Sequence, residues 1–309
     1  MAKYLKIAAS GCRCGAVAET AAPAETDAAV TACLERVFAA TAPEKPDLIV
    51  LSEMCDLPER WGMDAYCAYL QARGETVWRF VREKARALNT WVAFSTLRPV
   101  GGGRYRNSCF LLDRAGQTAA VFDKRHPTLG ELEIGVEPGD GPIAAECELG
   151  RVGCAICFDL NYTRDAAACA EQRLDLLLFP SLFHGGLLRQ LWAYTARAHL
   201  IAASGGCGAG ILSPLGQVLA ESAAGQPEVI DTVNTDCVPV HLDFHAEKLR
   251  CAQEQYGPAL SVSGPAGLGS VLVASESPCR TARQILEEFG IEPLDDYLRR
   301  VQWSTEEME

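Results

Sequence analysis

The sequence lacks the features that bring a protein to nucleic acid or to a membrane. It has no block of consecutive Lys and Arg, and its 40 Asp and Glu outnumber its 28 Lys and Arg, which gives a formal net charge of -12. Such an acidic balance disfavours a polyanionic partner such as nucleic acid or an anionic membrane surface. No run of about 18 uncharged apolar residues is present, so we expect no transmembrane helix.

The N-terminal segment MAKYLKIAASGCRCG also lacks the apolar core of a secretory signal peptide. Disulfide bonds are rare in reducing compartments. We therefore expect the 14 cysteines to be reduced and the protein to be cytoplasmic.

The composition favours an α/β protein with one large domain and a C-terminal extension. A chain of 309 residues that is 49% hydrophobic can bury a sizeable core. Apolar runs alternate with helical patterns, and the mixture of hairpins and crossovers implies sheet layers flanked by helices. We predict a domain over residues 1–235 and an extension over residues 236–309, which packs on the domain or is exchanged between subunits.

Strands are expected at short apolar runs and helices where apolar residues recur on one face. The helical stripes run from Val30 to Phe38 and from Val77 to Leu88, and a further helix lies around Trp192. Hairpins turn near Gly116 and Gly150. The other predicted strands are Tyr4–Ala9, Asp47–Glu53, Trp91–Thr96, Asp175–Ser181 and His199–Ser204, with VPVHLDF and GSVLVAS in the extension, where helical TARQILEEFG and LDDYLRRV follow.

Reactive side chains stand where three of these strands end. Glu53 closes DLIVLSE, Lys124 follows TAAVFD, and Cys157 follows RVGCAI. In open α/β sheets such strand ends form the crevice in which ligands bind. The sequence therefore predicts a site at this edge.

These segments resemble the carbon-nitrogen hydrolases of the nitrilase superfamily, whose signature is a Glu-Lys-Cys triad in this chain order. The resemblance covers roughly Tyr4 to Ser222 and rests on DLIVLSE, DKRHPTLGE and GRVGCAICFDLNY, with DLLLFPS and WAYTARAHLIAAS following. It implies an α-β-β-α sandwich, a homodimer or higher homo-oligomer, and a mechanism that needs no metal or other cofactor. It also implies that Cys157 is the nucleophile and that Glu53 and Lys124 are its partners.

The residues themselves are consistent with this chemistry. A free thiol with a pKa near 8.5 is only a few per cent thiolate at neutral pH, so Cys157 needs a base, and Glu53 can serve. The oxyanion formed on attack would be stabilised by the Lys124 ammonium and the backbone N–H of Phe158. Glu53 would then protonate the leaving amine and activate the water that hydrolyses the thioester.

A second glutamate is expected to orient Lys124 or the substrate nitrogen. Glu131, seven residues after Lys124 in Lys-x-x-Pro-Thr-x-x-Glu, has a spacing that resembles the lysine loop of nitrilase-branch enzymes. Glu133 and Glu137 are the alternatives. His184 follows the nucleophile strand, where a pocket role in substrate binding and a structural role are both open.

The branch signals within the family conflict. Cys157-Phe158-Asp159 looks like the amidase branches, whereas the lysine loop points to nitrilases, and Thr163-Arg164 replaces the usual Pro-Glu pair. We weight the nucleophile segment more and predict a hydrolase of a small linear amide or carbamoyl compound that releases ammonia or an amine. The alternatives are a nitrilase, an acyltransferase, a glutaminase and a non-catalytic assembly protein of the same fold.

Other motifs are interpreted structurally. Cys12 and Cys14 are expected to be loop cysteines, Cys154 a core residue, and GGCGAG a link between two strands rather than a phosphate-binding loop. His241, Asp243 and His245 share one face of a predicted strand and are the better metal candidate, but we predict no metal site.

Overall fold

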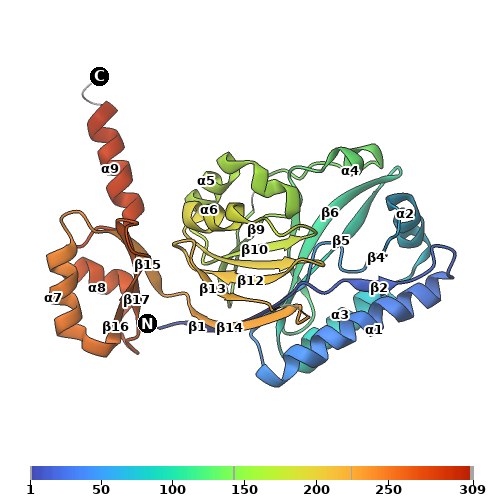
Figure 1. Cartoon of the computed structure of the whole chain (residues 1–309), viewed down its shortest axis with the longest axis horizontal. Helices are drawn as coiled ribbons and strands as arrows, with labels where there is room; N and C mark the ends of the chain where they lie inside the picture. Colours follow the sequence, from blue (N-terminus) through green and yellow to red (C-terminus); the bar gives the residue numbers. More distant parts are fainter. Residues whose placement is uncertain (1, 142, 224, 307–309) are drawn as a thin grey trace. The chain divides into compact units, whose positions relative to one another are not determined.

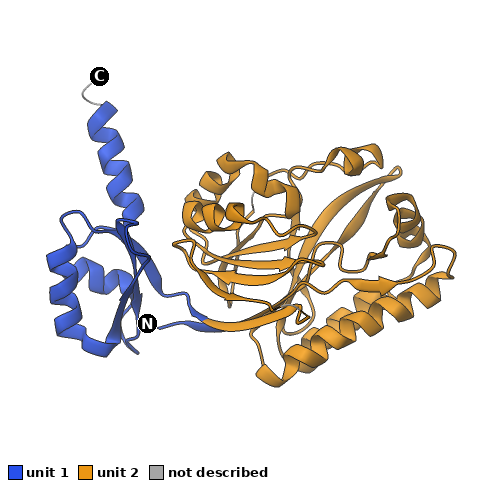
Figure 2. Cartoon of the chain, viewed as in Figure 1, with its two compact units in different colours: residues 1–5, 233–309 blue, residues 6–232 orange. Residues whose placement is uncertain are grey.

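A computed structural model describes residues 2–141, 143–223 and 225–306 of the chain. Two compact units are present, one formed by residues 6–232 and the other by residues 1–5 together with residues 233–309 (Figure 2). Each unit has its own hydrophobic core.

Two six-stranded mixed sheets make up most of the larger unit. The strand order is β14-β1-β3-β5-β6-β7 in the first sheet and β13-β12-β11-β10-β9-β8 in the second. Strands β1, β3 and β5 pair in parallel in the first sheet, and strands β9, β10 and β11 pair in parallel in the second. The pairs β5–β6, β6–β7, β8–β9, β11–β12 and β12–β13 are antiparallel. The first sheet comprises β1 (Tyr4–Ser10), β3 (Leu48–Val50), β5 (Trp91–Gly101), β6 (Arg104–Leu112), β7 (Thr118–Asp123) and β14 (Glu228–Asn234). The second comprises β8 (Ala145–Cys147), β9 (Gly150–Cys154), β10 (Leu176–Ser181), β11 (His199–Ser204), β12 (Gly208–Leu212) and β13 (Val218–Glu221).

Helices cover the outer face of each sheet (Figure 1). Helices α1 (Pro23–Thr41) and α3 (Thr76–Leu88) pack on the first sheet, where the Trp78 ring contacts the rings of Phe94 and Phe110. Helices α5 (Thr163–Glu171) and α6 (Leu187–Ala196) pack on the second around buried Trp192. The predicted α-β-β-α sandwich is confirmed.

The smaller unit is a three-stranded antiparallel sheet with helices. Its strand order is β15-β17-β16, and its core includes Val240, Val273 and Ile285. The predicted strands at VPVHLDF and GSVLVAS correspond to β15 and β17, and the two predicted helices correspond to α8 and α9. The elements are β15 (Cys237–His241), β16 (Leu260–Ser263), β17 (Ser270–Ser275), α7 (Ala246–Tyr256), α8 (Ala282–Glu288) and α9 (Leu294–Glu306).

Several short elements were not predicted. The strand expected to end at Glu53 ends at Val50, and the chain then forms a turn in which Met54 has a left-handed φ of 42°. Other elements that the sequence did not predict include β2 (Cys14–Ala16), β4 (Pro58–Glu59), α2 (Met63–Ala72) and α4 (Leu129–Glu133), with 3-10 turns at Ala42–Glu44, Cys157–Asn161 and Gly257–Ala259. Helices α5 and α7 and strands β13, β14 and β16 were not predicted either. Across the described residues, no helix combines the length and apolar character needed to cross a membrane.

Candidate active site

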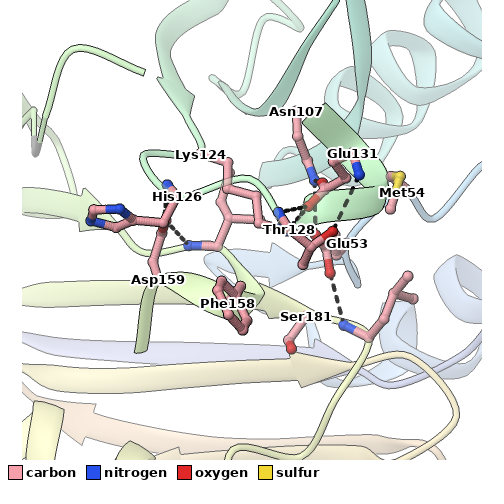
Figure 3. Close-up of polar contacts among 12 residues, drawn as sticks. Glu53, Met54, Asn107, Lys124, His126, Thr128, Glu131, Phe158, Asp159 and Ser181 are labelled. Atoms are coloured by element: carbon pink, nitrogen blue, oxygen red, sulfur yellow. Dashed lines mark hydrogen bonds and ion pairs between the residues drawn. The ribbon is translucent and has the colours of Figure 1, made fainter. Parts of the chain in front are cut away.

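The predicted site residues come from the ends of strands in both sheets. Glu53 lies three residues after β3 and Lys124 directly follows β7, both in the first sheet. Cys157 lies three residues after β9 in the second sheet. The face-to-face arrangement of the sheets thus brings together side chains that are far apart in sequence (Figure 3).

Lys124 is buried between two carboxylates. Its Nζ lies 2.9 Å from Glu53 Oε1 and 2.8 Å from Glu131 Oε2, and both Lys124 and Glu53 are only 1% exposed. Burial alone would lower the pKa of Lys124, but the negative charges around it outweigh this effect and raise the pKa above its ordinary value. Lys124 is therefore a fixed cation. Burial would raise the pKa of Glu131, but the charge of Lys124 and its hydrogen bond outweigh burial and lower that pKa.

Asn107 completes this charge cluster, although the sequence did not lead us to predict it as a site residue. Its Nδ2 donates to Glu53 Oε1 and to Glu131 Oε1, each at 2.8 Å, and the side chain is fully buried in β6. Its backbone carbonyl accepts a hydrogen bond of 2.7 Å from the N–H of Lys124. An Asn at the start of the apolar run NSCFLL was the available signal, because a buried amide needs polar partners.

The structure places Glu131, rather than either alternative glutamate, against Lys124. Glu131 occupies the third position of α4, where its Oε2 accepts the backbone N–H of Thr128 at 2.8 Å while Thr128 caps the helix. Glu133 is exposed, and Glu137 forms an ion pair with Arg104. The capping box thus fixes the carboxylate that faces Lys124.

Cys157 begins a 3-10 turn in a left-handed conformation, with φ of 50°. Burial and the negative charge of Glu53 raise the pKa of its thiol to about 12, while the charge of Lys124 and a hydrogen bond from the Leu182 N–H act in the opposite direction. The same N–H donates to Glu53 Oε2 at 3.0 Å. The thiol therefore lies beside both a potential base and a potential oxyanion partner, and it is protonated at neutral pH.

The two predicted substrate-binding residues differ in their surroundings. Phe158 follows Cys157 directly, is 36% exposed, and places its ring edge-on to that of Tyr162. His184 Nε2 lies 2.8 Å from Arg189 Nη2 and 3.2 Å from Glu221 Oε1. Among the described residues, the hydrogen bonds of the His184 side chain do not involve Glu53, Lys124 or Cys157.

The described part of the chain contains no group of three or more His, Cys, Asp or Glu side chains arranged to hold a metal ion. His241 stacks on Tyr297 with 5.1 Å between ring centroids, and its Nδ1 lies 3.5 Å from Asp243 Oδ2. Buried His245 points toward the N–H of Glu292 instead. His241 and Asp243 thus pair with each other, while His245 has a separate partner.

Residues 7–232 match the protein family described as carbon-nitrogen hydrolase. A nitrilase and fragile histidine triad fusion protein, NitFhit of Drosophila melanogaster, is 27% identical over 130 residues, which are 39% of this chain and 28% of that protein. A hydrolase of Schizosaccharomyces pombe is 22% identical over 167 residues, which are 50% of this chain and 51% of that protein. The matched regions therefore span from about a quarter to half of these relatives.

Solved structures share the fold at low sequence identity. Nit3 of Saccharomyces cerevisiae, a member of branch 10 of the nitrilase superfamily, aligns with a TM-score of 0.63 and 17% identity over 75% of this chain and 90% of that one. An amidase from Nesterenkonia sp. AN1 aligns with a TM-score of 0.62 and 18% identity over 73% of this chain and 91% of that one. Both agree with the α-β-β-α arrangement described above.

Proposed function

Because the chain belongs to the carbon-nitrogen hydrolase family, whose reactions cleave C–N bonds other than peptide bonds, we propose that it hydrolyses a small linear amide or carbamoyl compound through a thioester on Cys157. The observation that carries this proposal is the position of the Cys157 thiol beside Glu53 and Lys124, whose charges act on its pKa in opposite directions. A base and an oxyanion partner on the same thiol are what acyl transfer to sulfur requires.

In the proposed first half-reaction, Glu53 takes the thiol proton while the Cys157 sulfur attacks the substrate carbonyl carbon. The oxyanion is stabilised by the Lys124 ammonium and by the backbone N–H of Phe158. The intermediate collapses as its C–N bond breaks, and Glu53 returns the proton to the leaving ammonia or amine. The product of this half-reaction is a thioester.

In the second half-reaction, Glu53 removes a proton from water as the water attacks the thioester carbon. Collapse of the new oxyanion breaks the C–S bond, releases the acid and returns the proton to the sulfur. Glu131 and Asn107 act through their neighbours, because they fix Lys124 and Glu53 by hydrogen bonds of 2.8 Å. We assign them positioning roles.

An amide rather than a nitrile is favoured by the Cys157-Phe158-Asp159 segment. In variants of the Nesterenkonia amidase, the acetamide moiety of fluoroacetamide adds covalently to the active-site cysteine. That protein therefore admits a small amide to its cysteine. The same substrate class is our proposal here, with His184 and Phe158 assigned to substrate binding.

The wider setting is also part of the proposal. We infer a cytoplasmic protein that forms a homodimer or a higher homo-oligomer, with residues 1–235 as the hydrolase domain and residues 236–309 as an extension that packs on it or is exchanged between subunits. Sedimentation of the purified chain would measure the oligomeric state.

The deciding experiment measures ammonia release from matched amides and nitriles, carbamoyl compounds and glutamine, comparing wild type with Cys157→Ala. Cys154→Ala is the matched control, because Cys154 ends β9 three residues earlier. We expect amide or carbamoyl turnover that is lost only in Cys157→Ala. Turnover that survives in Cys157→Ala would refute the mechanism, turnover of nitriles alone would assign a nitrilase, and faster turnover with added amines would indicate acyl transfer.

A further inference from the structure

Asp159 is a buried carboxylate to which the proposed mechanism gives no role. It lies two residues after Cys157, in the same 3-10 turn, and is 5% exposed. Burial raises the pKa of Asp159, and hydrogen bonds from backbone N–H groups counteract part of this shift. A buried carboxylate needs such partners, and those of Asp159 come from two separate segments.

One partner lies in the nucleophile segment. Asp159 Oδ2 accepts the backbone N–H of Ile156 at 2.9 Å, and the Asp159 N–H donates to the Ile156 carbonyl at 3.1 Å. These two bonds close the turn around Cys157, whose φ of 50° is unfavourable for a residue with a Cβ atom. The carboxylate therefore stabilises the turn that contains the nucleophile.

The other partners lie in the lysine loop. Asp159 Oδ1 accepts the N–H of His126 at 2.8 Å, and Oδ2 lies 3.4 Å from the N–H of Arg125 (Figure 3). These are the two residues directly after Lys124, whose own N–H and carbonyl are already fixed by Asn107 and Gly139. The backbone on both sides of Lys124 is thus anchored.

From this geometry we infer that Asp159 is a positioning residue that joins the nucleophile turn of one sheet to the lysine loop of the other, and so sets the distance between the Cys157 sulfur and the Lys124 ammonium. The inference rests on the proposed function, because it assumes that these two groups act on one substrate. A carboxylate suits this task since both oxygens are acceptors, whereas an amide would turn an NH₂ group toward an N–H donor.

The test uses Asp159→Asn and Asp159→Glu in the full chain, with Asp175→Asn as the matched control. Asp175 also accepts a backbone N–H between strands, from Arg151 at 2.7 Å, but it immediately precedes β10, at the opposite end of that strand from the site. The first readout is the rate at which iodoacetamide alkylates Cys157, followed by mass spectrometry of the Cys157 peptide. The second readout is the change in kcat compared with the change in KM, for an amide that the wild type hydrolyses in the substrate panel.

We expect Asp159→Asn to slow alkylation of Cys157 by about tenfold or more and to lower kcat by on the order of a hundredfold with a smaller change in KM, as displacement of a reacting group by about 1 Å would do. Asp159→Glu keeps the charge and both acceptor oxygens, so it should recover part of each loss. Asp175→Asn should match wild type at Cys157. A purely structural role would instead lower thermal stability and leave the alkylation rate and kcat of the folded protein unchanged.

The outcomes separate this inference from the proposed function. Wild-type protein that is neither alkylated at Cys157 nor active on the panel would overturn both. Wild-type labelling and turnover that Asp159→Asn leaves unchanged would overturn the positioning role alone. If circular dichroism shows that Asp159→Asn does not fold, Asp159→Glu decides, because its longer side chain cannot hold both segments at their present separation and should still reduce kcat.

Discussion

Replacing Lys124 by Met should destabilise the protein strongly at neutral pH. Met keeps most of the apolar stem but removes the only cation that lies within 2.9 Å of both Glu53 and Glu131 among the described residues. Two buried carboxylates would then share only the Asn107 amide. Removing one partner of a buried ion pair typically costs about 3–5 kcal/mol of unfolding free energy, and we expect a loss in this range.

The loss should shrink as the pH falls. In the wild-type protein the folded pKa of Glu131 is lowered, so its stabilising contribution is complete above its unfolded pKa and disappears as the pH falls through the folded value. Lys124→Met removes the charge that lowers the pKa of Glu131, and repulsion by the Glu53 carboxylate then raises the folded pKa of Glu131. That carboxyl binds a proton more tightly when folded, so the variant regains stability on acidification while the wild type does not.

Urea unfolding followed by circular dichroism at several values between about pH 8 and pH 5 would measure both effects. Lys84→Met is the control, because the Lys84–Glu35 pair lies at the surface and should contribute less than about 1 kcal/mol. Adding Glu131→Gln to Lys124→Met should restore part of the stability. A loss below about 1 kcal/mol at neutral pH, or one that is independent of pH, would refute the charge-cluster argument.

Two further changes test other parts of the site, and a third tests a buried ion pair that the site does not include. Asn107→Ser removes the amide that bridges the two glutamates and should cost about 1–3 kcal/mol in urea unfolding; an unchanged midpoint would contradict this. Glu53→Gln should lower the pKa of the Cys157 thiol from about 12, because the Glu53 charge raises it. Alkylation of Cys157 by iodoacetamide should then begin at lower pH than in the wild type, although amide turnover is lost. Alkylation that begins at higher pH would contradict this expectation. Arg73→Met leaves buried Asp56 without the cation 2.7 Å away and should cost about 3–5 kcal/mol by urea unfolding. Stability equal to that of the wild type would contradict this expectation.

The approximate position of the site was predictable because strand ends in a layered α/β fold lie along one edge. Apolar runs located β3, β7 and β9, and the polar residues just beyond them were Glu53, Lys124 and Cys157. Glu131 could be assigned by its spacing from Lys124, and the alternatives Glu133 and Glu137 were separated from it only by the short helix α4. That helix and its capping box occupy too few residues to give a periodic signal.

The contacts between these residues were not predictable, because they depend on which strands pair and on how the two sheets pack against each other. Asn107 looks like an ordinary polar residue at the start of an apolar strand until pairing in the sheet places it beside Lys124. Asp159 served only as a branch marker in the sequence, because its acceptor role depends on backbone N–H groups 33 and 34 residues away. The surroundings of His184 likewise depend on Arg189 and Glu221, which come from α6 and β13.

The raised pKa of Cys157 is consistent with a mechanism that uses no preformed thiolate. A thiol with a pKa of about 12 is protonated at neutral pH, so a thiolate can form only as the proton passes to a neighbouring base. In the proposed reaction that base is Glu53, and the transfer moves a negative charge from one neighbour of Lys124 to another without changing the net charge of the buried cluster. Because Lys124 stays charged throughout, the proton moves between two sites that face the same cation. The negative charge then passes from the Cys157 sulfur to the substrate oxyanion. In that mechanism the second carboxylate, Glu131, would keep Lys124 in place while Glu53 is neutral.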